Sequence, residues 1–187
     1  YYIGLYSRAV AVSGLVMMVP RMFGPLLFAK WSSVIGEARA RQAELVLRSS
    51  MAYAIPAAIA IMLLGKYVIL ILYGAEFVPA ADALRILAPA IVFVTIFGTC
   101  SNLLAGDGRA TITVYILAGT VIIIFIVTCL LVPMLGIRGA ALGALCGNGF
   151  MAIASFAVCR KLYRLKLLRC LLLRKSDLTY IRQALRR

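Results

Sequence analysis

The chain has 187 residues, of which 64% are hydrophobic and 14% are charged. Soluble domains average about 45–50% apolar and about 25% charged residues, and a soluble fold of this size could not bury so much apolar surface. The composition therefore excludes a soluble globular domain. The formal net charge is +14, and half of the Lys and Arg residues lie at the C-terminal end, after Cys159. Inside a membrane protein such charge sets topology, so we expect no nucleic-acid partner.

The residue types that catalysis and metal binding need are scarce. The chain has no histidine, and none of its cysteines forms a C-x-x-C pair. We therefore expect no metal site, no cofactor and no enzymatic activity. The cysteines are expected to act as small, buried apolar residues; they are Cys100, Cys129, Cys146, Cys159 and Cys170.

Five apolar stretches approach or reach the length of about 20 residues that a transmembrane helix needs. They predict an all-α, polytopic bundle of about five spans within residues 1–161, followed by a basic tail at 162–187. The predicted spans are 3–29, 50–73, 84–104, 111–132 and 139–158. The second is interrupted by Gly65-Lys66. The piece at 67–73 after it either extends the span or lies flat at the interface.

Basic residues are distributed unequally between the two sides of this predicted bundle. Fifteen of the 20 Lys and Arg residues fall on one side and three on the other, and the positive-inside rule makes the richer side cytoplasmic. The loops 32–47 and 106–109 and the tail are then cytoplasmic, whereas Tyr1, 74–81 and 133–138 are outside. In the tail, leucine clusters alternate with Arg and Lys, which favours binding to anionic headgroups over contact with a partner protein.

The last predicted span begins with a glycine repeat. Gly139, Gly143 and Gly147 recur every four residues and share one helix face. Small residues at this spacing let a neighbouring helix approach to backbone contact. We expect tight helix packing at this face, and the spacing says nothing about a substrate.

Prolines stand inside or beside several predicted spans. An interior proline removes a backbone hydrogen bond and bends its helix. Broken helices at membrane depth are common in transporters, although kinked helices also occur in proteins that transport nothing. We expect helix kinks at Pro20, Pro56 and Pro89, with further prolines at Pro25 and Pro133.

Arg8 and Arg21 are charges within the first apolar stretch, about 20 Å apart if it is helical. A charge in hydrocarbon costs at least about 2.5 kcal/mol, so such a residue usually faces a wet cavity or an anion. The alternative is that both side chains snorkel to the headgroups. Arg21, and with it Arg8, is the substrate-binding candidate. None of the acidic residues lies in the middle of a span.

Four local motifs follow one another along the chain. They are Gly4-x-Tyr6-x-x-Ala9, Tyr73-Gly74-x-x-Phe77-x-x-Ala80, Asn102-Leu103-Leu104-x-Gly106-x-Gly108-Arg109 and Leu131-x-Pro133-x-x-Gly136-Ile137-x-Gly139-Ala140-Ala141. Each motif is weak alone, but their order and spacing over residues 4–161 make the combination fairly specific. Together they resemble the polysaccharide flippases of the multidrug/oligosaccharidyl-lipid/polysaccharide exporter superfamily, although Arg21 departs from that family's pattern.

The resemblance implies the last five helices of a two-lobed transporter with twelve or more helices, in a bacterial inner membrane. It implies that a polyprenyl-pyrophosphate-linked oligosaccharide is flipped by alternating access, for surface polysaccharide synthesis. The implied partners are this lipid, membrane lipids and the N-terminal half of the same transporter. A multidrug extruder, a lipid II flippase and a non-transporting scaffold of a glycan synthesis complex remain alternatives.

Overall fold

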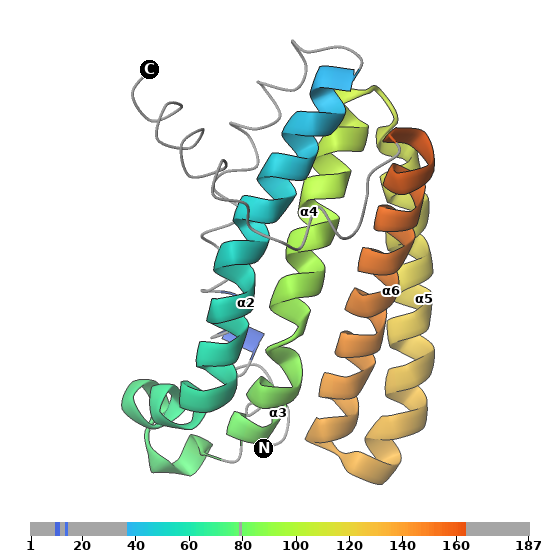
Figure 1. The fold of residues 1–187 in the computed structure, drawn as a ribbon. Helices are drawn as coiled ribbons and strands as arrows, with labels where there is room; N and C mark the ends of the chain where they lie inside the picture. The colour runs from blue at the N-terminus through green and yellow to red at the C-terminus, as the bar shows by residue number, and fades with distance from the viewer. Residues whose placement is uncertain (1–9, 12–13, 15–36, 79, 164–187) are drawn as a thin grey trace.

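The computed structural model of the chain describes residues 10–11, 14, 37–78 and 80–163. Within these residues the fold is a bundle of α-helices without a β-strand (Figure 1), which confirms the expected all-α class. In chain order the elements are α2 (Glu37–Tyr73), the 3-10 helix η1 (Ala75–Phe77), α3 (Ala80–Leu87), α4 (Ala90–Gly106), α5 (Ala110–Leu135) and α6 (Ile137–Tyr163).

Four segments of the described chain are long and apolar enough to cross a membrane, and they match the last four predicted spans. They are Glu44–Tyr73, Ala81–Gly106, Ala110–Leu135 and Ile137–Tyr163. The chain is therefore a multi-pass membrane protein. The first predicted span, at 3–29, lies outside the described residues except for Val10, Ala11 and Gly14, which are helical.

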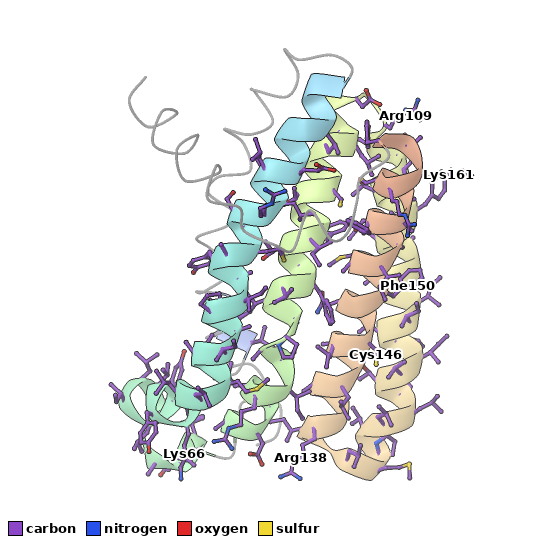
Figure 2. The ribbon with its side chains drawn as sticks, viewed as in Figure 1. Lys66, Arg109, Arg138, Cys146, Phe150 and Lys161 are labelled. Carbon is purple, nitrogen blue, oxygen red and sulfur yellow. The ribbon has the colours of Figure 1, made fainter. Side chains whose placement is uncertain are left out.

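Helix α2 is longer than its predicted span. From Glu37 onward the predicted connection at 32–47 is already helical, and the helix continues without a break through Gly65 and Lys66 to Tyr73. The apolar segment Glu44–Tyr73 has 30 residues, about 45 Å at 1.5 Å per residue, which exceeds a hydrocarbon core of about 30 Å. Figure 1 shows the last turns of α2 leaving the line of the helix, at the end where Figure 2 labels Lys66.

The third predicted span is two helices rather than one. Helix α3 ends at Leu87, and α4 begins at Ala90 with Pro89 as its N-cap. Proline has no backbone N–H to continue the ladder, and the chain turns at Ala88 and Pro89. Of the other predicted kink sites, Pro56 lies inside the continuous helix α2 and Pro20 lies outside the described residues.

The helices are arranged in the order α2, α4, α6 and α5, as Figure 1 shows. Helix α4 contacts both α2 and α6, whereas α5 packs mainly on α6. Apolar side chains of α2, α3 and α4 form one buried cluster that includes Met51, Leu84 and Ile91, and Leu103, Leu104 and Cys159 belong to a second. Side chains on the outside of the bundle are also apolar, with Ile71 and Met134 each 81% exposed.

A single residue, Gly136, joins α5 to α6. The predicted loop at 133–138 is wrong in its extent, because α5 continues through Pro133 to Leu135 and α6 begins at Ile137. Gly136 has φ of 56°, a left-handed conformation that lacks a steric penalty only for glycine. The two helices therefore form a tight antiparallel hairpin.

The three repeated glycines of α6 lie against α5. A Cβ atom at Gly139 would overlap the carbonyl of Leu131, and one at Gly143 would overlap the side chain of Thr128. At Gly147 it would overlap the side chain of Ile124, within α5. The absence of side chains is thus what allows the close approach of α6 to α5.

Polar contacts tie α6 to the rest of the bundle at both of its ends. At its start, Arg138 donates a hydrogen bond to Asp82 of α3 at 2.5 Å. At its end, the Tyr163 hydroxyl donates to Asp107, between α4 and α5, at 2.9 Å, and Arg109 lies 3.3 Å from the same carboxylate. Figure 2 shows Arg138 and Lys66 at one end of the bundle, and Arg109 and Lys161 at the opposite end.

Candidate functional site: a lateral groove with a basic end

Only some of the residues singled out from the sequence are among the described residues. Arg8 and Arg21 lie outside the described residues, so their roles remain predictions. The three glycines contact α5 and offer no polar group to a ligand.

The described residues form a cavity between α2, α4 and α6. Its volume is about 590 Å³, within the range of about 300–1,000 Å³ typical of ligand sites. Leu47 and Met51 contribute from α2, and Phe93 and Ile96 from α4. Along α6 it is lined by Ala152, Ile153, Phe156, Ala157, Arg160 and Lys161. We refer to this cavity as the lateral groove.

The wall formed by α6 follows helical periodicity. Ala152, Phe156 and Arg160 are four residues apart and form one row along the helix, and Ile153, Ala157 and Lys161 form the adjacent row. Residues at this spacing lie one above the other on the same face. Each row therefore passes from apolar side chains to a cation over about 12 Å.

Arg160 and Lys161 make the end of the groove electropositive. Both side chains are exposed, and among the described residues neither has an ion-pair partner. The two cations stand in the last turn of α6, where the helix dipole favours positive charge and where they are free to bind an anion. They lie at the end of the bundle that also carries Arg109, as Figure 2 shows for Lys161.

Apart from Arg160 and Lys161, the side chains that line the groove are apolar. Leu47 and Met51 are buried, whereas the rings of Phe93 and Phe156 are half-buried. Methionine side chains are flexible and polarizable, so they adjust to irregular apolar ligands. The groove thus suits a molecule that is hydrocarbon along most of its length and anionic at one end.

Sequence reasoning missed this groove because it needs three helices that are distant in the chain. Arg160 and Lys161 counted only as charges near the tail. A signal was present in the rows 152/156/160 and 153/157/161, but the sequence does not indicate that Leu47 and Phe93 face them.

The cysteines are only in part the buried residues that were expected. Cys100 and Cys159 are buried, and the Cys159 thiol lies 3.7 Å from the carbonyl oxygen of Cys100. The prediction is wrong for Cys129 and Cys146, which are exposed on the bundle surface. Because the outside of a transmembrane bundle is itself apolar, a small thiol there needs no burial in protein. The described residues hold no group of His, Cys, Asp and Glu that could bind a metal.

The fold and the groove define a multi-pass α-helical membrane protein with an apolar lateral cavity. No protein-family model, curated protein or solved structure matches the chain.

Proposed function

We propose that this chain is part of a flippase that moves a polyprenyl-pyrophosphate-linked oligosaccharide across a bacterial inner membrane. The lateral groove is the observation that carries the proposal. Its apolar lining suits a lipid chain, and its basic end, at Arg160 and Lys161, suits a pyrophosphate. A transporter of organic cations would not need a cationic end.

The way the helices are joined supports movement as a rigid unit. The hairpin of α5 and α6 packs through glycines, and polar contacts hold α6 at Asp82 and at Asp107. Alternating access in transporters is largely rigid-body rocking of one bundle against another. A bundle held together at both ends of α6 suits that role. Transport of this kind makes and breaks no covalent bond.

The proposal is tested by filling the groove. Ala157 lines it and has a small side chain, so Ala157→Trp should block the chain of a lipid without disturbing the core. The intact protein would be reconstituted in vesicles with a fluorescent polyprenyl-pyrophosphate-linked oligosaccharide, and the rate at which the label becomes inaccessible to an external quencher would be measured. We expect transport by the natural protein and loss of most of the transport with Ala157→Trp.

Ala118→Trp is the matched control, because Ala118 is exposed on α5 and does not line the groove. It should transport at the natural rate. Transport by Ala157→Trp at that same rate would show that the groove is not used. Absence of transport by the natural protein would favour a scaffold, and transport of organic cations alone would favour a multidrug extruder.

A further inference from the structure

The lateral groove ends part of the way along the bundle. On each helix, the lining residue farthest from the basic end is Met51 (α2), Phe93 (α4) or Ala152 (α6). The two rows of α6 residues continue one turn farther, at Asn148 and Gly149, because residues four apart lie on the same face of a helix. Neither of these two residues lines the groove. The groove is therefore closed at this level by a side chain of another helix.

That side chain is Phe93 of α4. A Cβ atom at Gly149 would lie 3.6–4.0 Å from three carbons of the Phe93 ring, which is ordinary van der Waals contact. Because Gly149 has no side chain, no α6 side chain separates the ring from the backbone of α6 at that position. The ring thus stands across the path along which the groove would otherwise continue.

Beyond this level, the space between the helices is packed. Leu84 of α3, Ile91 of α4 and Ala141 of α6 belong to one buried cluster, and each is 0% exposed. A hydrogen bond from Arg138 to Asp82 holds α6 to α3 on the same side. The groove and the packed cluster are therefore two parts of one interhelical space, separated at the level of the phenylalanine ring.

The closure at Phe93 differs in kind from the packed cluster behind it. Leu84 and Ile91 are fully buried, whereas Phe93 is half-buried and borders the groove. A side chain that borders a cavity can change rotamer without displacing its neighbours. In addition, the Thr95 hydroxyl donates to the carbonyl of Ile91 at 2.7 Å, an arrangement that often bends helices. Phe93 is therefore the part of the closure that can move while the bundle stays folded.

We propose that Phe93 is a gate residue: its ring against Gly149 closes the lateral groove, and rotation of the ring extends the groove along α6 to Asn148. The Asn148 amide, which donates to the carbonyl of Ala144 at 2.8 Å, then becomes a polar group of the groove, about 18 Å along the helix from Arg160. The role of the gate in transport rests on the proposed function, since alternating access needs a barrier across the path of the substrate. The closure itself does not depend on it.

Cysteine accessibility measures the gate without any substrate. The intact protein, in a cysteine-free background, would carry Asn148→Cys and be placed in lipid nanodiscs, which leave both ends of the bundle in water. The reagent is a small anionic methanethiosulfonate. We expect slow modification when residue 93 is phenylalanine. Phe93→Ala should make it about tenfold faster, the order of the factor that burial of half a phenylalanine ring contributes. Phe93→Leu should give an intermediate rate, and Phe93→Trp a lower rate than the natural ring.

Three controls separate a gate from a general loosening of the bundle. Phe125→Ala removes the same ring from the exposed face of α5 and should leave the rate at Asn148→Cys unchanged. Ala157→Cys lines the groove and should react rapidly whichever residue stands at position 93. Ala141→Cys lies in the packed cluster and should stay unreactive. The thermal unfolding temperature of each variant shows whether it is folded.

The inference is overturned if Asn148→Cys reacts as fast in the natural protein as in Phe93→Ala, or if Ala157→Cys does not react. It is equally overturned if Phe93→Ala also exposes Ala141→Cys, because the ring then supports the whole bundle. Should Phe93→Ala not fold, the order of rates among leucine, phenylalanine and tryptophan decides the question. Its failure is distinct from that of the proposed function. Transport with an ungated groove removes the gate alone, whereas gated accessibility without transport supports the gate and removes the flippase.

Discussion

Of the three repeated glycines of α6, Gly139 is the one whose nearest neighbours in α5 are all backbone atoms. A Cβ atom there would overlap the carbonyl of Leu131 and lie 2.9 Å from the amide nitrogen of Val132. These neighbours are main-chain atoms of α5 near its C-terminal end, so they cannot rotate away as a side chain can. The glycine repeat of α6 is therefore a requirement for backbone contact.

Gly139→Ala should destabilise the protein by about 1–3 kcal/mol, the usual cost of overpacking. The matched control is Gly98→Ala in α4, where a Cβ atom meets nothing within 4 Å. There the gain in helix propensity, up to about 1 kcal/mol, should leave stability equal or slightly higher. Thermal unfolding of the purified protein in detergent measures both, and equal effects of the two substitutions would contradict the packing described here.

At the scale of elements, the turn between α4 and α5 holds the end of α6. Tyr163 is the last residue of α6, and its hydroxyl donates to Asp107, which caps the C-terminal end of α4. A hydrogen bond to a carboxylate contributes about 1.5–3 kcal/mol when it is protected and less when it is exposed. The Asp107 side chain is 30% exposed, so the bond should contribute toward the lower end.

A double-mutant cycle with Tyr163→Phe and Asp107→Asn should give a coupling free energy of about 1 kcal/mol. Tyr115→Phe is the control, because that tyrosine is 75% exposed on α5 and its hydroxyl has no described partner. Chemical unfolding in detergent gives each free energy. Additive effects of Tyr163→Phe and Asp107→Asn would show that the contact does not hold the end of α6.

The helices could be predicted from the sequence where the features that determine them are local, such as apolar length or a proline. Apolar length predicted the four described spans, because a membrane imposes a minimum length on each. Pro89 was expected to disturb its span, and it divides it into α3 and α4. The single-residue link at Gly136 was missed, because Pro133 suggested a loop although it is accommodated in the last turn of α5. The lateral groove was missed because the contacts among α2, α4 and α6 are not local.

At the scale of the whole molecule, the basic residues divide between the two ends of the bundle. Arg109 and Lys161 lie at one end, and Lys66 and Arg138 at the other, as Figure 2 shows. The groove reaches the first of these ends through Arg160 and Lys161. From the positive-inside rule we expect this end to be cytoplasmic, and a lipid bound in the groove would then have its phosphate in the cytoplasmic leaflet.

Cysteine labelling tests this orientation. In a cysteine-free background, Val78→Cys should react with a membrane-impermeant maleimide added to intact cells, because position 78 follows η1 at the end that carries Lys66. Ala40→Cys, in the first turns of α2, should react only after the membrane is permeabilised. Arg109→Cys should behave like Ala40→Cys, since both positions lie at the opposite end. Labelling of all three from outside would contradict the arrangement of the bundle itself. The reverse pattern would leave the fold intact but place Arg160 and Lys161 at the outer leaflet, where they would receive a lipid after its transfer instead of before it.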